Sequence, residues 1–160
     1  MCLGLAVGRG ATPLARLGGD EPLVSDADVV LLGRRDEGQP YYGHAALAQS
    51  RVLDLTDATL SARGFAESAA VALGRLTNPR LRGFWIHVDV DAISPLEMPA
   101  VDSPEPGGPT VADIVELIAP LVRHPRALGL ELTIYDPKLD PDRVCARRLV
   151  ALLETVFGTN

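Results

Sequence analysis

The chain has 160 residues, of which 47% are hydrophobic, and a formal net charge of −6 from 21 acidic and 15 basic residues. This length suits one domain over residues 1–160 with a sizeable apolar core, and the absence of a basic cluster argues against a nucleic-acid partner. Residues 1–10 lack the pattern of a signal peptide or membrane span, and Cys2 and Cys145 match neither a disulfide framework nor a zinc spacing. We therefore expect a cytoplasmic protein without a membrane partner.

Apolar runs typical of buried strands alternate with helical patterns along the chain. Residues 1–10 are rich in small side chains and predict a short helix that packs closely against a neighbour. Further along, apolar spacing and capping residues predict strands over 29–32, 51–55, 84–90 and 127–135, and helices over 44–49, 56–78, 110–123 and 140–156. Such alternation, with continuous apolarity in the strands, favours an α/β fold with a mostly parallel sheet covered on both faces.

The segment 84–94 contains two aspartates in the pattern Asp89-x-Asp91, at the end of a predicted strand. Because side chains alternate along a strand, both carboxylates should project from the same face. Two acids at the end of an apolar strand are unfavourable without a positive partner, and carboxylate oxygens suit hard cations such as Mn, Mg or Ca. Ligands of open parallel sheets bind beyond the carboxyl ends of the strands, where this pair lies. Asp89 and Asp91 are therefore the predicted metal ligands.

Other ionisable residues near this pair allow less specific predictions. His87 shares a strand face with Asp89, but a histidine beside carboxylates is more often a hydrogen-bonded neighbour than a ligand, so we leave it out of the metal set. Asp102 is predicted to be a turn residue rather than a ligand. Glu105 either bonds to the site or caps the helix that begins near Thr110.

Three segments together resemble one known enzyme family. They are His-Val-Asp-Val-Asp (87–91), Pro-Ala-Val-Asp-Ser-Pro-Glu-Pro-Gly-Gly (99–108) and Leu-Glu-Leu-Thr-Ile-Tyr-Asp-Pro (130–137). The combination resembles the arginase/agmatinase (ureohydrolase) family, strongly over 84–137 and weakly before it. The resemblance implies a three-layer α/β/α fold, two Mn²⁺ ions bridged by hydroxide and held in part by Asp89 and Asp91, and hydrolysis of a guanidino or related C–N bond.

The sequence departs from this family pattern at the later strand. Arginases usually carry a substrate-pairing Glu three residues before the Pro that ends the strand, and Ile134 occupies that position here. Glu131 lies three residues earlier, an odd offset that places a strand side chain on the opposite face. An unpaired acid in an apolar strand is unfavourable, so we expect Glu131 to have a buried partner or to lie in a cleft. Glu131 is the candidate catalytic residue, and arginine itself is not predicted as the substrate.

The family's other metal ligands have no counterpart in this sequence. Gly18-Gly19-Asp20 is followed by Glu21 where the family has His, and no Asp-x-His-x-Asp motif is present. We therefore expect an N-terminally truncated, C-terminal half of a family member, with half a metal site and no activity alone. Its expected partner is a small guanidino-type substrate. A sheet cut through its middle exposes an edge strand, which predicts a homo-oligomer.

Two other hypotheses compete with this one. The first is a truncated, non-catalytic association module that keeps the fold but has a weak or empty metal site. The second is a nucleotide-sugar transferase, in which an Asp-x-Asp pair holds Mn²⁺ against a diphosphate. The Pro/Gly-rich loop over 99–109 has no role in the transferase hypothesis.

Overall fold

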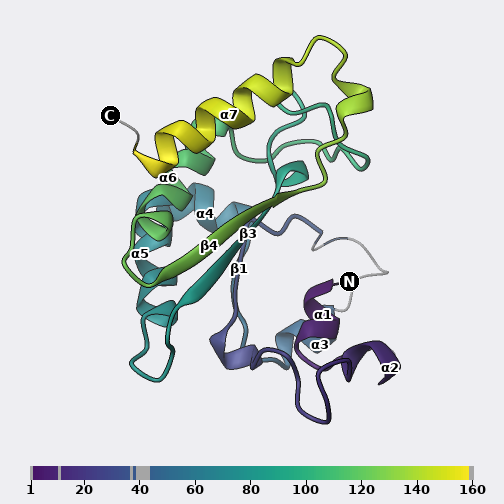
Figure 1. Cartoon of the computed structure of the whole chain (residues 1–160), viewed down its shortest axis with the longest axis vertical. Helices are drawn as coiled ribbons and strands as arrows, with labels where there is room; N and C mark the ends of the chain where they lie inside the picture. The colour runs from purple at the N-terminus through teal and green to yellow at the C-terminus, as the bar shows by residue number, and fades with distance from the viewer. Residues whose placement is uncertain (1, 11, 37, 39–43, 159–160) are drawn as a thin grey trace.

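The computed structural model describes residues 2–10, 12–36, 38 and 44–158 (Figure 1). Its helices are α1 (Cys2–Ala6), α2 (Thr12–Ala15), α3 (His44–Ala48), α4 (Asp57–Arg63), α5 (Phe65–Leu76), α6 (Val111–Val122) and α7 (Val144–Phe157). Its strands are β1 (Val30–Leu32), β2 (Leu53–Leu55), β3 (Phe84–Asp89) and β4 (Ala127–Thr133). Short 3-10 turns lie at Asp26–Asp28, Val90–Ala92 and Pro137–Leu139. Each predicted strand and helix therefore has a counterpart, although most are shorter than predicted.

The strands form two parallel pairs. Val30 of β1 lies opposite Leu53 of β2, and His87 of β3 lies opposite Glu131 of β4. Within the described residues, no hydrogen-bonded ladder joins one pair to the other. Parallel pairing between strands that alternate with helices confirms the predicted α/β class.

The two faces of the β3–β4 pair differ in their surroundings. Helices α5, α6 and α7 lie on one side of the strands, and α1 to α3 lie on the other side, beyond β1 (Figure 1). Phe84, Ile86 and Val88 of β3 join the main core on the helical side. On the opposite face, Trp85 is 59% exposed and His87 is half exposed. The predicted covering of both faces thus differs from the described chain, where β3 alternates between buried and exposed residues because helices meet only one of its faces.

Gly64 divides the helix predicted over 56–78 into α4 and α5. Thr56 caps α4 as predicted, because its hydroxyl accepts a hydrogen bond from the backbone N–H of Thr59 at 3.3 Å. Gly64 has φ +98°, a backbone conformation that glycine adopts without the steric conflict of a side chain. The chain therefore turns at a residue that the apolar periodicity alone would place inside one long helix.

Helix α7 begins at Val144 rather than at the predicted Asp140-Pro141 pair. The Asp140 carboxylate instead accepts hydrogen bonds from the backbone N–H groups of Cys145 (3.2 Å) and Ala146 (2.8 Å) and from the Tyr135 hydroxyl (3.0 Å). Burial opposes ionisation of Asp140, but these donors hold its pKa below the ordinary value. Asp140 thus caps α7 from outside and ties it to the segment after β4.

We predict that Asp140→Ala lowers the melting temperature at neutral pH, because three donors lose their charged acceptor. The pKa of Asp140 is lower in the folded chain than its ordinary value of 3.8. Its stabilisation is therefore fully present above that value and is lost as the pH falls through the folded-state pKa. Thermal melts of both proteins from neutral to acidic pH should show a gap that closes below about pH 4. Asp142→Ala, at an exposed position, is the control and should melt like the parent.

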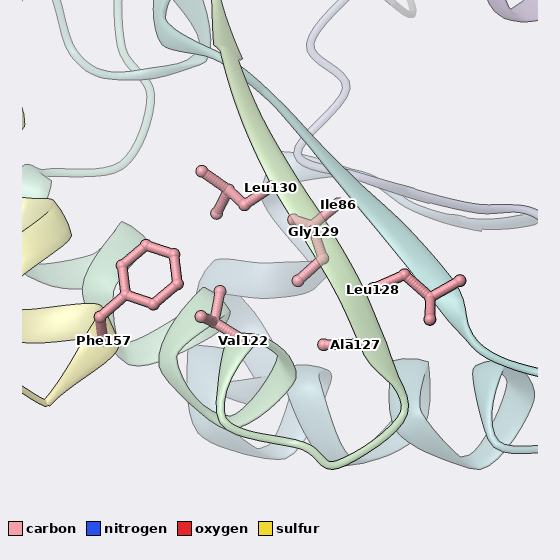
Figure 2. Close-up of a pocket in the computed structure, with 7 residues that line it drawn as sticks. All are labelled: Ile86, Val122, Ala127, Leu128, Gly129, Leu130 and Phe157. Carbon is pink, nitrogen blue, oxygen red and sulfur yellow. The ribbon is translucent and has the colours of Figure 1, made fainter.

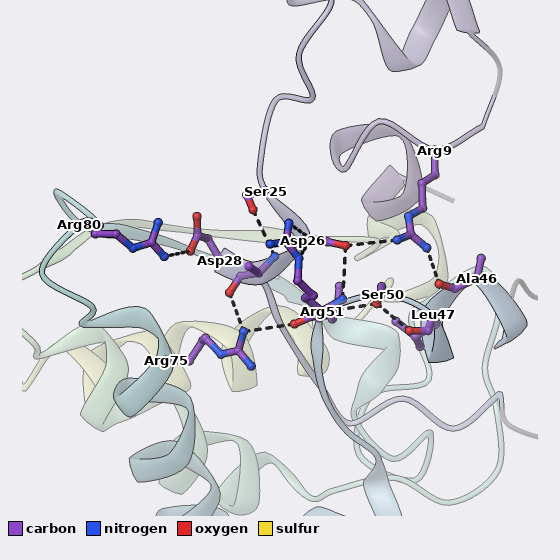
Figure 3. Close-up of polar contacts among 12 residues, drawn as sticks. Arg9, Ser25, Asp26, Asp28, Ala46, Leu47, Ser50, Arg51, Arg75 and Arg80 are labelled. Atoms are coloured by element: carbon purple, nitrogen blue, oxygen red, sulfur yellow. Dashed lines mark hydrogen bonds and ion pairs between the residues drawn. The ribbon is translucent and has the colours of Figure 1, made fainter.

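A polar network joins the N-terminal segment to the segment before β2 (Figure 3). Asp26 accepts hydrogen bonds from the side chains of Arg9 at 3.2 Å and Arg51 at 2.9 Å. Arg75 of α5 donates to the backbone carbonyls of Ala27 and Arg51. Because the acids of this network already have basic partners, we assign it to chain placement and not to ligand binding.

Candidate metal site

Strand β3 ends at Asp89, and Asp91 lies in the 3-10 turn that follows it. The prediction that the strand extends through Val90 and places Asp91 by alternation is therefore wrong. The turn nevertheless leaves the two carboxyl groups near each other, since the charge of Asp89, after burial, raises the pKa of Asp91. The pair is thus formed by a tight turn at the carboxyl end of β3.

Within residues 2–10, 12–36, 38 and 44–158, the carboxylates of the acidic pair have no positively charged partner. Asp89 Oδ1 is buried and has no hydrogen-bond partner in the part of the chain that the structure describes. Burial, followed by the charge of Asp89, raises the pKa of Asp91 to about 6; Asp102 adds to this effect and Arg35 opposes it. Among the described residues, no ion pair includes either aspartate. A hard divalent cation would supply the charge that this oxygen pair lacks, so the residues fit the predicted metal.

The acidic pair by itself offers few oxygen ligands for a metal ion. In the described ranges, no group of three or more His, Cys, Asp or Glu side chains is arranged to hold a metal ion. Protein sites for hard cations usually contain more oxygen ligands than two carboxylates supply. The half site therefore stays a prediction.

The Pro/Gly-rich loop that follows the pair is held at both ends by local hydrogen bonds. The backbone N–H of Ser94 donates to the carbonyl of Pro109 at 2.8 Å. Thr110 caps α6 as predicted, and Asp113 completes a reciprocal capping box with it. Glu105 is exposed and takes no part in this capping, so Asp113 fills the role that was considered for Glu105. The two ends of the loop are therefore held close to the acidic turn.

Arg35, which no sequence pattern indicated, contacts the turn that carries Asp91. Its guanidinium donates to the backbone carbonyl of Asp91 at 3.0 Å and to that of Ala92 at 2.6 Å. More than fifty residues separate the partners along the chain. A contact of this separation leaves no local signal in the sequence.

Glu131 lies on the open face of the β3–β4 pair, not in a closed cleft. Its carboxylate accepts a hydrogen bond from His87 Nδ1 at 2.8 Å, and the Thr133 hydroxyl lies 3.3 Å from the other ring nitrogen. The hydrogen bond from His87 lowers the pKa of Glu131. The partner of Glu131 is half exposed and not buried as expected, and in the described chain His87 bonds to Glu131 and not to the aspartates beside which we placed it. Thr133 pairs with Asp89, so Glu131 lies on the same strand about 7 Å from that register position.

Ile134 follows β4 in a left-handed conformation, with φ +72°. The strand has already ended at Thr133. The alternation of strand side chains, which we used to place Ile134 and Glu131 on opposite faces, therefore does not apply to Ile134. A β-branched residue with positive φ is rare and carries backbone strain. This strain lies at the carboxyl end of β4, the same end of the sheet as the acidic pair.

The sequence and the structure of this chain were compared with those of known proteins. The family model described as "Arginase family" matches residues 9–158. The chain is 27% identical over 158 residues to an arginase of Brevibacillus brevis, covering 99% of this chain and 52% of that protein. It is 31% identical over 78 residues to a formimidoylglutamase of Salmonella arizonae, covering 48% of this chain and 25% of that protein. The native arginase structure from Bacillus caldovelox superposes with a TM-score of 0.86 at 25% identity, covering 99% of this chain and 52% of that one.

These matches define an α/β protein with the arginase fold, as the resemblance implied. The chain belongs to the arginase family. It spans about half the length of the curated arginases and the arginase structures that it matches. The match to the arginase family favours an arginase-family protein over a nucleotide-sugar transferase. In the part of the chain described by the structure, no helix has both the length and the apolarity needed to cross a bilayer.

Proposed function

We propose that this chain supplies the two-aspartate half of a manganese centre in an arginase-family hydrolase that cleaves a guanidino or related C–N bond. The observation that carries the proposal is the buried Oδ1 of Asp89, which lies beside Asp91 and has no hydrogen-bond partner among the residues the structure describes. The names of the matching relatives, arginase and formimidoylglutamase, support the substrate class. When bound, the ions would activate water as a nucleophile and stabilise developing negative charge.

The residues of this chain have distinct proposed roles. Asp89 and Asp91 would hold Mn²⁺ through their carboxylate oxygens, and the loop that follows them would lie beside the ion. Glu131 carries a negative charge on the open face of β4, where it is suited to meet the cationic group of a guanidino substrate. His87 fixes the orientation of the Glu131 carboxylate through their 2.8 Å hydrogen bond. We propose Glu131 as the catalytic residue of this half on that basis.

Activity is tested by completing the fold. The chain would be joined to the part of the Brevibacillus brevis arginase that its match does not cover. The chimera should hydrolyse at least one compound in a panel of guanidino and formimino compounds when loaded with Mn²⁺. The same chimera with Asp91→Asn should lose this activity. A folded, Mn²⁺-loaded chimera that hydrolyses no member of the panel would count against the proposed reaction.

The alternative of a non-catalytic association module rests on one specific observation, the lack of a third metal-binding side chain near the pair in the described residues. The hydrolase hypothesis and the association-module hypothesis predict different metal binding by the chain itself. Calorimetric titration with Mn²⁺ should show binding that depends on Asp89 and Asp91 if the centre is retained. Absence of any binding would favour the association module.

We also propose that the chain forms homo-oligomers through the free edge and open face of β4. Within the described chain, β4 pairs only with β3, and Leu128 of β4 is 67% exposed. Beside the strand, Val122 and Phe157 line an apolar cavity of about 150 Å³ together with Leu130 (Figure 2). An apolar strand with a free edge is a template for pairing with another copy.

We predict that the parent chain elutes as a dimer or larger species and that Leu128→Lys shifts it to monomer, because a lysine on an edge strand opposes pairing. Light scattering coupled to gel filtration at micromolar concentration measures the mass. Leu96→Lys is the control, since Leu96 is 91% exposed but lies outside the sheet. A parent chain that is monomeric and melts cooperatively would contradict the proposed assembly.

A further inference from the structure

Arg35 holds the turn of the acidic pair by its backbone and leaves the carboxylates unpaired. Its Nη1 donates to the carbonyl of Ala92 at 2.6 Å, and its Nη2 donates to the carbonyl of Asp91 at 3.0 Å. An arginine beside an aspartate commonly forms a two-pronged ion pair with the carboxylate. No ion pair between Arg35 and Asp91 is found among the described residues, so the guanidinium does not compete with a cation for those oxygens.

Gly108 provides the space that this contact needs. A Cβ at position 108 would lie 1.8 Å from Arg35 Nη1 and 2.7 Å from the carbonyl oxygen of Ala92. Gly108 also has φ +91°, which disfavours any side chain there. The Pro/Gly-rich loop, the segment after β1 and the turn after β3 therefore meet at one point, and the guanidinium lies between them.

We infer that Arg35 is a positioning residue for the proposed metal centre: it fixes the Val90–Ala92 turn so that Asp91 presents its carboxylate beside Asp89. The inference rests on the proposed function, because it assigns Arg35 a role toward the metal. Its physical basis is geometric. Two donors on one rigid guanidinium plane hold the consecutive carbonyls of Asp91 and Ala92, and the Asp91 carbonyl carbon is bonded directly to the Cα that bears the Asp91 carboxylate side chain.

The chain offers a closely matched control for this contact. Arg126 also donates to two consecutive carbonyls, those of Thr77 at 2.6 Å and Asn78 at 3.0 Å. This second clamp ties the segment before β4 to the end of α5, far along the chain from the acidic turn. Arg126→Ala therefore removes the same kind and number of hydrogen bonds without touching the site.

Metal binding tests the role of Arg35. Electron paramagnetic resonance titration of free Mn²⁺ should show affinity weakened about tenfold or more by Arg35→Ala and by Gly108→Ala, in line with the effect of other residues that orient metal ligands. Arg35→Lys, which keeps the charge but not the fork of donors, should fall between Arg35→Ala and the parent. Arg126→Ala should bind Mn²⁺ like the parent, even where its melting temperature falls. Equal losses in Arg35→Ala and Arg126→Ala would overturn the inference, because a general loss of stability would then explain both.

Hydrogen exchange tests the clamp without any metal. The backbone N–H of Ile93 donates to the carbonyl of Val90 at 3.2 Å and reports the closure of the turn. Its exchange should quicken roughly tenfold in Arg35→Ala and stay unchanged in Arg126→Ala. Unchanged exchange in Arg35→Ala overturns the inference regardless of metal. Faster exchange, combined with a parent chain that binds no Mn²⁺, would instead overturn the proposed metal centre and the role of Arg35 toward it.

Discussion

Replacing Asp91 by Asn should weaken Mn²⁺ binding by roughly a hundredfold, at or beyond the upper end of what loss of an orienting partner causes. The substitution keeps the shape of the side chain but removes one negative charge and one strong oxygen ligand. It also removes the repulsion between two half-buried carboxylates. We therefore expect the metal-free Asp91→Asn chain to melt at the same temperature as the parent or higher, so that binding and stability change in opposite directions.

Calorimetric Mn²⁺ titration and thermal melts with and without the metal measure both quantities. In the parent, Mn²⁺ should raise the melting temperature because it binds the folded chain, and in Asp91→Asn this rise should largely disappear. Asp142→Asn, an exposed aspartate near α7, is the charge-matched control and should bind as the parent does. If Asp91→Asn retained the full Mn²⁺ affinity of the parent, the metal would bind at another site, and the proposed role of Asp91 would be wrong.

A large loss of stability is expected from truncating a side chain in the apolar core beneath α7. Leu152 is 2% exposed and belongs to the apolar cluster that α7 forms against α6. Leu152→Ala removes buried methyl groups and leaves a cavity, which costs about 2–5 kcal/mol of unfolding free energy. Domains of this kind have total stabilities of about 5–15 kcal/mol, so the variant should lose a large part of its stability.

Urea unfolding followed by circular dichroism measures this loss. The urea concentration at the midpoint of unfolding should fall, while the dependence of the unfolding free energy on urea concentration stays unchanged. Val150→Ala on the same helix is the control, because Val150 is 54% exposed and its truncation should change stability by less than about 0.5 kcal/mol. Similar midpoints for the two variants would show that α7 contributes little to the core.

Local signals predicted much of the fold. Thr110 was assigned as the cap of α6 because capping depends on residues within one helical turn, and the structure contains that cap. The break at Gly64 was missed because the apolar spacing continues across it. The start of α7 was misplaced because Asp140 and Pro141 form a good helix start on their own, whereas in the fold Asp140 also bonds to Tyr135 and caps the helix from further back.

The candidate site was predictable in its residues but not in its geometry. Asp89 and Asp91 stand out by type and spacing, yet the path between them is a 3-10 turn that strand alternation does not describe. The partner of Glu131 was not predicted, because His87 lies opposite Glu131 only once the register of the two strands is known. Arg35 could not be found at all, because its contact with the turn depends on the three-dimensional meeting of distant segments.

Trp85, the single tryptophan of the chain, provides an intrinsic optical probe of the open face. Its indole ring lies over Gly129, where a Cβ would come within 2.2 Å of the ring, and it remains 59% in contact with solvent. Any polypeptide that covers this face must dehydrate the indole and shift its emission to shorter wavelength. Fluorescence of the unlabelled protein can therefore follow, in real time, the binding of another polypeptide to this face.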